Sequence, residues 1–167
     1  MTTAWKRHMP WLVNLYPPFL GAGIRVRRLR PDWKAIDVEM KLRFWNANYV
    51  GTHFGGSLYS MTDPFYMLML IENLGREYLV WDKAANIRFR KPGAGKVLAS
   101  FRLSDEEIEE IRQEVDMKGK CEPEFLVDVK DETGNVIAEV RKVLYVRKRS
   151  QQRSSRTEDV SAAVIQS

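Results

Sequence analysis

The sequence predicts an α+β fold in which a strongly curved antiparallel sheet wraps around a central apolar helix. Three observations predict this class. The stretch at 56–74 is apolar on every side of a helix, so it must be enclosed and not merely covered on one face. Two strand-like segments precede it and four follow, with connections short enough for antiparallel neighbours. Apolar and charged residues alternate strand-like, most clearly at 35–45.

The first elements lie before the central helix. We predict a short helix at 3–16, which Pro17 and Pro18 end, and then strands at 23–30 and 35–45. In the second strand four apolar side chains share one face: Ile36, Val38, Met40 and Leu42. The charged residues between them face the other way, which indicates a sheet with one face toward the core.

The central helix ends at Gly75, which is typical of a C-terminal stop. Near its middle, Asp63 stands directly before Pro64. Aspartate followed by proline is a common helix start, with the aspartate as N-cap, and would break or kink the helix there. The alternative is that Asp63 is a reactive group. The two interpretations are compatible, because a kink that frees backbone groups can lie at an active site.

The remaining elements follow the central helix. Four strands are predicted, at 78–90, 95–104, 124–135 and 136–149. Ser104 and Glu107 form a capping box for a helix at 105–115. The apolar stripe of this helix is narrow and consists of Ile108, Ile111 and Val115. We therefore expect this helix at the surface.

A chain of 167 residues has the length of one domain. We predict that domain at 1–149, with an N-terminal helical segment at 1–20. A flexible tail is expected at 150–167, where the composition turns to Ser, Gln, Arg and Asp. The net charge is +5, but much of the excess lies at 147–156, which is typical of a solvated tail. We therefore expect no nucleic-acid partner.

The longest apolar stretch, 58–71, is too short to span a bilayer and contains Asp63. Prolines and Asn14 interrupt the apolar run near the N-terminus, which argues against a signal peptide. We expect a soluble, cytoplasmic protein that does not associate with membranes.

The single cysteine, Cys121, excludes an intramolecular disulfide framework and fits a reducing compartment. Glu122 and Glu124 lie beside it and would raise the pKa of the thiol, so we do not expect a nucleophile. The two histidines, His8 and His53, are too few and too far apart to indicate a zinc site. No metal is predicted.

A spaced motif leads from the loop at 46–54 into the central helix. It consists of Asn48, Gly51, the run Phe54-Gly55-Gly56, and Asp63. This spacing resembles the hotdog-fold acyl-CoA thioesterases of the phenylacetate-pathway type, which carry an asparagine, a glycine, a His-Gly-Gly and an aspartate. The stretch "NIRFRKPG" resembles the strand that follows the helix in those enzymes.

The sequence departs from that family at one position. Phe54 occupies the place of the family histidine, and His53 lies one residue earlier. The stretches "PPFLGAGIRV" and "FGGSLYSMTDP" are together most similar to a branch of hotdog domains of unknown function. The resemblance covers about 10–148.

The resemblance implies a thioesterase that hydrolyses a fatty or aromatic acyl-CoA without a metal, with coenzyme A present only as part of the substrate. Hotdog proteins are generally homodimers or dimers of dimers, which implies an active site at a dimer interface. The alternative is a non-catalytic protein that binds or senses acyl-CoA. Phe54 in the histidine position favours this alternative, whereas Asn48 and Asp63 favour the enzyme.

Gly55 and Gly56 could take part in thioester hydrolysis by forming an oxyanion site. The free N–H groups at a helix N-terminus stabilise an oxyanion, and glycine lets a carbonyl approach them closely. The alternative is that the two glycines only permit a tight turn. Gly56 and Asp63 would lie about 10 Å apart along one helix, too far to reach one thioester carbon. Catalysis therefore requires two antiparallel helices around a two-fold axis.

Three further polar residues are candidates for the active site. Asn48 would orient the carbonyl or a water, or else form an Asx-turn in its loop. His53 would be a general base, or else a loop residue. By the resemblance, Asp82 lies near a second polar active-site group; its alternative is an edge-strand charge paired with Lys83.

Substrate contacts are expected on two surfaces. Arg88, Arg90 and Lys91 share a polar strand face that would meet the phosphates of coenzyme A, or else is merely solvated. The acyl pocket would be lined by Phe54, Tyr59, Tyr66, Met67 and Leu70.

Overall fold

An antiparallel sheet of seven strands curves around the central helices in the computed structural model, which describes residues 13–149. The strands are β1 (Ile24–Leu29), β2 (Ala35–Lys41), β3 (Tyr78–Phe89), β4 (Lys96–Arg102), β5 (Lys120–Cys121), β6 (Glu124–Asp131) and β7 (Val136–Lys148). Their order across the sheet is β1-β2-β4-β6-β7-β3, and the short β5 pairs with β7. The predicted α+β class is confirmed.

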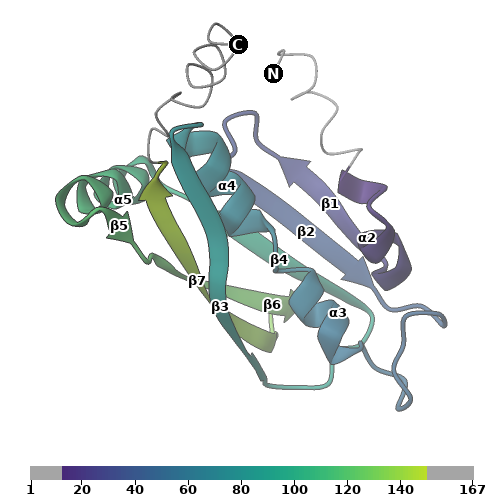
Figure 1. Cartoon of the computed structure of the whole chain (residues 1–167). Coiled ribbons are helices and arrows are strands. Elements are labelled where there is room, and N and C mark those ends of the chain that lie inside the picture. The colour runs from purple at the N-terminus through teal and green to yellow at the C-terminus, as the bar shows by residue number, and fades with distance from the viewer. Residues whose placement is uncertain (1–12, 150–167) are drawn as a thin grey trace, which may run out of the picture.

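The described helices are α2 (Pro17–Ala22), α3 (Gly55–Ser60), α4 (Phe65–Leu74) and α5 (Asp105–Lys118). Figure 1 shows α3 and α4 on the concave side of the sheet, with α5 at one end. None of the helices in this part of the chain is long and apolar enough to cross a membrane. The predicted tail at 150–167, and the N-terminal segment as far as residue 12, lie outside the described residues.

The start of α2 corrects one prediction. Pro17 and Pro18 were expected to end a helix at 3–16, and the helical residues Val13 and Asn14 do stop before them. What the sequence did not predict is α2 itself, a second helix that begins at Pro17. Proline fits the first helical positions because their N–H groups have no partner within the helix. Gly23 then ends α2 in the left-handed conformation, with φ of 74°.

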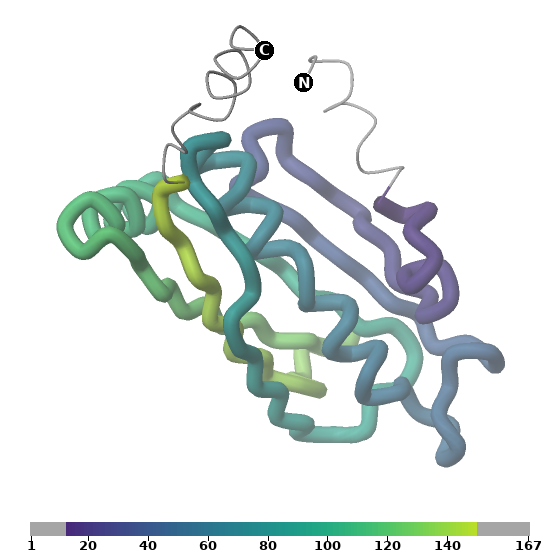
Figure 2. Tube along the Cα trace, viewed as in Figure 1, coloured from purple at the N-terminus to yellow at the C-terminus, as the bar shows by residue number. Residues whose placement is uncertain are grey.

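The central helix is also corrected. The stretch at 56–74 is not one helix, because the chain leaves the helical path after Ser60 and resumes it at Phe65. Pro64 has no N–H to donate, so the break falls where the sequence suggested a kink. The trace in Figure 2 shows α3 and α4 as consecutive helical segments on one side of the curved sheet.

The core lies between these helices and the concave face of the sheet. Leu58, Met61, Phe65, Met69 and Leu70 from the helical side are nearly inaccessible. The sheet contributes alternate residues of each strand, among them Val38, Met40, Val97, Phe101, Val129 and Leu144. Enclosure of α4 is incomplete, since Ile71 on its outer side is 40% exposed.

Two strand predictions are adjusted at their ends. β2 stops at Lys41, and Leu42 begins a loop in which its N–H donates to the Gly95 carbonyl at 2.6 Å. Phe44 in this loop is 92% exposed. The two-residue strand β5 was not predicted, because a segment so short has no periodicity to read.

Candidate active site

The break between α3 and α4 determines where Asp63 points. The N-cap position of α4 is Pro64, and no side chain caps this helix. The expectation that Asp63 serves as the helix cap is therefore wrong. Its carboxylate, with 45% of the side chain exposed, is turned toward the sheet instead. An opposite charge in the sheet explains this orientation.

That charge is Lys142 on β7, which the sequence reading missed. Its side chain is fully buried, and its Nζ donates to Asp63 Oδ1 at 2.9 Å. Nζ also lies 2.8 Å from Asp82 Oδ1. This second contact is an ion pair without hydrogen-bond geometry. A buried ammonium is tolerated only when it is paired, and here two carboxylates flank it.

A usable signal for Lys142 existed in the alternation of β7. Val140 and Leu144 are the inward residues on either side of it, so Lys142 occupies a core position in the strand pattern. A lysine in phase with buried residues is rare unless it is paired, so this position indicates a buried lysine with an acidic partner.

The alternation of β3 brings Asp82 to the same place. Asp82 is in phase with the buried Tyr78 and Val80 and lies opposite the inward Leu144 on β7, so its side chain faces inward beside Lys142. The register shifts directly after it, between Asp82 and Ala84, and the extra residue there is Lys83. Lys83 pairs with Glu122 instead, with 2.5 Å between their charged atoms.

Tyr59 completes this cluster from α3. Its hydroxyl donates to Asp63 Oδ1 at 2.8 Å, and the Lys142 ammonium lies 5.4 Å from the centre of its ring. Asp63 Oδ1 therefore accepts two hydrogen bonds. Within the described residues no donor reaches Asp63 Oδ2, so this oxygen of a half-exposed carboxylate is left for another molecule.

The charges of the cluster influence one another. Burial raises the pKa of Asp82 above its usual value, and the nearby Asp63 charge adds to this, although the Lys142 ammonium opposes both. Burial by itself would lower the pKa of Lys142, but Asp82 and Asp63 outweigh it and the pKa is raised. Lys142 is therefore an ammonium at neutral pH. Burial and the bond to Asp63 also raise the pKa of Tyr59.

Several predicted site residues gather at a different place, the start of α3. They line a pocket of about 610 Å³ and include Asn48, His53, Gly55, Arg90 and Lys91. A neighbouring hollow of about 420 Å³ includes Phe54 and Gly56. The structure thus divides the candidates into this α3 pocket and the cluster formed by Tyr59, Asp63, Asp82 and Lys142.

Asn48 and His53 hold the loop that leads into α3. Asn48 Oδ1 accepts from the N–H groups of Val50 (3.1 Å) and Thr52 (3.0 Å), which is an Asx-turn. His53 is buried, and its Nε2 lies 3.1 Å from the Gly95 carbonyl, to which it donates in the neutral form. Burial lowers the pKa of His53. The structure places both in loop-building roles, and their catalytic roles stay predictions.

Aromatic rings lie over the two glycines. A Cβ on Gly55 would be 2.9 Å from Phe89 Cζ, and one on Gly56 would be 2.5 Å from Phe54 Cε1. The absence of a Cβ thus admits two rings against the start of α3. This use of the glycines was not among the predicted ones.

The remaining candidates separate into core and surface. Tyr66 is buried and stacks on Phe125 with 4.2 Å between ring centres, and Leu70 is fully buried, so both belong to the core. Met67 is partly buried against that core. Arg88 is exposed, and Arg90 pairs with Glu139 at 2.6 Å on the outer face of β3.

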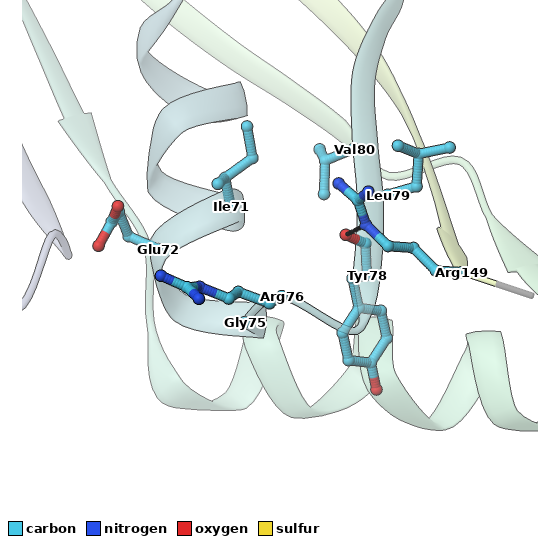
Figure 3. Close-up of a pocket in the computed structure, with 8 residues that line it drawn as sticks. All are labelled: Ile71, Glu72, Gly75, Arg76, Tyr78, Leu79, Val80 and Arg149. Carbon is cyan, nitrogen blue, oxygen red and sulfur yellow. Dashed lines mark hydrogen bonds between the residues drawn. The ribbon is translucent and has the colours of Figure 1, made fainter. Parts of the chain in front are cut away.

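A third hollow, of about 540 Å³, lies at the far end of α4 (Figure 3). Ile71 from α4 and Val80 from β3 line it, together with Arg76 and Arg149. Arg149 Nε donates to the Tyr78 carbonyl at 3.4 Å. None of the predicted site residues lies there.

Solved structures with this fold include three that span nearly the whole chain. A protein of unknown function from Pseudomonas aeruginosa, described as a probable thioesterase, has a TM-score of 0.73 at 23% identity and covers 89% of this chain and 97% of its own. A protein of unknown function from Chlorobaculum tepidum has 0.67 at 14%, covering 86% and 94%. A thioesterase from Haemophilus influenzae has 0.63 at 15%, covering 88% and 93%.

These likenesses confirm the hotdog fold, since identities so low establish the fold alone. No curated protein matches the chain in sequence. A family model described as a domain of unknown function (DUF4442) matches residues 6–146. Because this match spans most of the chain, the protein belongs to the DUF4442 family.

Proposed function

We propose that the protein is a thioester hydrolase that acts on fatty or aromatic acyl-CoA, with Asp63 as base or nucleophile. One observation carries this proposal. Tyr59 and Lys142 hold one oxygen of the Asp63 carboxylate, while the other accepts no hydrogen bond from the described residues. An acid that is held at one oxygen and partly exposed is suited to accept a proton or attack a carbonyl.

Either role of Asp63 gives a balanced reaction. As a base, Oδ2 takes a proton from a water that attacks the thioester carbon, and the proton then passes to the leaving thiolate. As a nucleophile, Oδ2 attacks the carbon and expels the thiolate, and water hydrolyses the resulting anhydride. Both routes consume one water and release a carboxylic acid and a thiol. Neither role assigns a step to a metal.

The proposed oxyanion donors are the backbone N–H groups of Gly55 and Gly56, as the sequence led us to expect. They lie about two helical turns from Asp63 along the chain, so one subunit does not bring both to the same carbon. We propose a homodimer, alone or within a dimer of dimers, in which the helices of two subunits run antiparallel and each site uses Gly56 of one chain and Asp63 of the other. The incomplete cover of α4, where Ile71 is 40% exposed, supports this arrangement.

Coenzyme A would be held near the α3 pocket. Arg90 and Lys91 line that pocket, and Arg88 is exposed on the same strand. Guanidinium and ammonium groups bind phosphates well, so these three side chains are the proposed contacts to the phosphates of the substrate. Phe54 and Tyr59 remain the proposed acyl contacts, whereas Tyr66 and Leu70 are committed to the core.

A second function, acyl-CoA binding without hydrolysis, is favoured by the aromatic rings over the glycines. Phe89 packs on Gly55 and Phe54 packs on Gly56, in the space through which a carbonyl would approach the amides. Both rings are the ends of rotatable side chains. The enzyme requires them to turn away from the glycines, and a sensor does not.

The test is hydrolysis of acyl-CoA across chain lengths, followed by free thiol, with Asp63→Asn as the variant. Asparagine keeps the shape and can still accept from Tyr59, so the protein should fold. It cannot take a proton or attack, so turnover should fall by at least about a hundredfold.

The matched control is Asp128→Asn. The side chain of Asp128 is exposed to a similar degree, 42%, and pairs with Lys130 on the outer face of β6. Full turnover is expected in this control. Unchanged turnover in a folded Asp63→Asn protein would exclude Asp63 from the chemistry. Binding of acyl-CoA without hydrolysis by the unchanged protein would support the sensor.

A further inference from the structure

Lys142 stands out among the charged residues of the described chain. It is the one Lys, Arg, Asp or Glu there that is buried. The inward residues next to it on β7 are Val140 and Leu144, so an apolar side chain would continue the core without any cost of desolvation. Replacing a buried ion pair with apolar residues often leaves a protein as stable or more stable. A gain in stability therefore does not explain why a lysine occupies this core position.

The groups that face Lys142 come from three directions. Asp63 lies in the break before α4, Asp82 on β3, and Tyr59 on α3. Two carboxylates thus share one ammonium, with a phenol beside them. Asp63 is the more accessible of the two carboxylates, with 45% of its side chain exposed against 25% for Asp82. The side chain of Lys142 is not exposed at all. A substrate can reach Asp63, but it cannot reach Lys142.

These contacts restrict the orientation of Asp63. The bonds from Lys142 and Tyr59 both end on Oδ1, which fixes the rotation of the carboxylate and leaves Oδ2 directed away from them. With one of these bonds removed, the carboxylate could turn about the other. The position of Asp63 is therefore set by Lys142 together with Tyr59.

We propose that Lys142 is a positioning residue for the reaction, which aims Oδ2 of Asp63 at the substrate. This inference rests on the proposed role of Asp63 and deepens it. Asp82 pairs with the same ammonium from β3 and so helps to hold it in place. The cluster of Tyr59, Asp63, Asp82 and Lys142 then works as one unit, in which only Asp63 contacts the reacting atoms.

The test measures kcat and KM separately for Lys142→Met. Methionine fills the space of the lysine but cannot donate to Asp63, so one of the two bonds that orient the carboxylate is lost. kcat should fall at least about tenfold, since the acid is no longer aimed, while KM should change little because Lys142 does not contact the substrate.

Lys83→Met is the matched control. Lys83 is adjacent to Asp82 in sequence but pairs with Glu122 on the outside of the sheet, so kcat and KM should both be unchanged. A role confined to folding would lower the melting temperature of Lys142→Met and leave kcat per folded molecule as it is. A lower kcat with an unchanged KM in the folded protein would support the proposal, and an unchanged kcat in folded Lys142→Met would overturn it.

A second readout needs no substrate. In a crystal structure of Lys142→Met, the Asp63 carboxylate should have left the place that it occupies in the unchanged protein. If Lys142→Met does not fold, Lys142→Gln takes its place with the same expectation. An Asp63 side chain that stays in place in the folded variant would overturn the inference alone. Absence of hydrolysis in every protein would instead overturn the proposed function, and the position of Asp63 would still decide the role of Lys142.

Discussion

Single residues in this protein acquire their properties from neighbours that are distant in sequence. Lys142 lies 79 residues from Asp63, and yet its ammonium helps to set the direction in which that carboxylate points. Cys121 shows the same principle with the opposite result. Burial and a bond to Glu114 raise the pKa of its thiol to about 12. Buried Lys142 therefore belongs to a candidate site, whereas buried Cys121 is unreactive.

Alkylation of Cys121 tests this inertness. At pH 8 only about one thiol in ten thousand would be a thiolate, which makes labelling by iodoacetamide about a thousandfold slower than for an ordinary cysteine. Mass spectrometry of the native and the urea-unfolded protein measures the two rates. Fast labelling of the native protein would contradict the burial of Cys121 against α5.

The stability of Asp82→Asn should depend on pH in a defined direction. The pKa of Asp82 in the folded protein lies above the reference value of 3.8, so ionising it costs folding free energy as the pH rises beyond that value. Asparagine avoids this cost. The variant should melt at the same or a higher temperature than the unchanged protein at pH 7, with the difference vanishing below about pH 4.

Thermal melts between pH 3 and 7 measure this difference. A variant that becomes less stable than the unchanged protein as the pH rises would show that the pair with Lys142 stabilises more than burial costs.

Two irregular elements lie at the candidate cluster. The break between α3 and α4 frees Asp63 from the helical path, and the bulge in β3 begins directly after Asp82. Interruptions of this kind cost regular hydrogen bonds and are common next to functional sites. The regular elements around them provide the rigid frame.

The best-defined regular element is α5, whose start carries a complete capping box. Ser104 Oγ accepts from the Glu107 N–H at 3.1 Å, and the Glu107 carboxylate accepts from the Ser104 N–H at 2.7 Å. Ser104→Ala should lower the stability by about 1 kcal/mol, because the Glu107 N–H loses its acceptor. For a chain of this size that corresponds to a fall in Tm of about 2–4 °C.

Ser104→Asp is the conservative control for this prediction, since its carboxylate can still accept from the N–H groups of the first turn. A thermal melt that shows equal loss for alanine and aspartate would mean that the cap contributes little to α5.

The whole molecule presents an open edge. β3 is the last strand of the sheet and pairs along one side only, with β7. Trp81 and Phe89 on this strand are 40% and 53% exposed. A long unpaired edge with exposed aromatics is a liability for a single chain and favours a partner strand. The open edge is therefore a second observation that supports the proposed homodimer, beside the exposure of Ile71.

Mixing two inactive variants tests whether the active site is shared between subunits. Asp63→Asn and Gly56→Val would each be inactive alone. If each site takes Gly56 from one chain and Asp63 from the other, a mixed dimer has one intact site. Random exchange of subunits should then restore about a quarter of the original turnover, because half of the dimers are mixed and each has one of two sites.

The control for this experiment is each variant alone, taken through the same exchange procedure, which should remain inactive. Sedimentation of the unchanged protein at micromolar concentration should show a dimer or larger. No recovery of turnover in a mixture proven to exchange would place each site within one subunit.

The sequence by itself determined most of the fold, because the signals for it are local. Alternation over 35–45 marked a strand and its inward face, 136–149 was recognised as a strand, and Ser104 with Glu107 marked the start of α5. Proline was read only in part, since Pro17 follows the end of one helix, as expected, but also begins α2, which was not predicted. The same residue type both starts and stops helices, and its neighbours do not always decide which.

The candidate site was only half determined by the sequence. Asp63 and Asp82 were named from a resemblance, and the break near Pro64 was visible as a possibility. Tertiary structure alone decided that the two acids meet at Lys142, and that Asn48 and His53 gather in a separate pocket. The reason is physical: a pattern of alternation shows which face of a strand is buried, but which charges meet there depends on the register of β3 against β7 and on the break between α3 and α4.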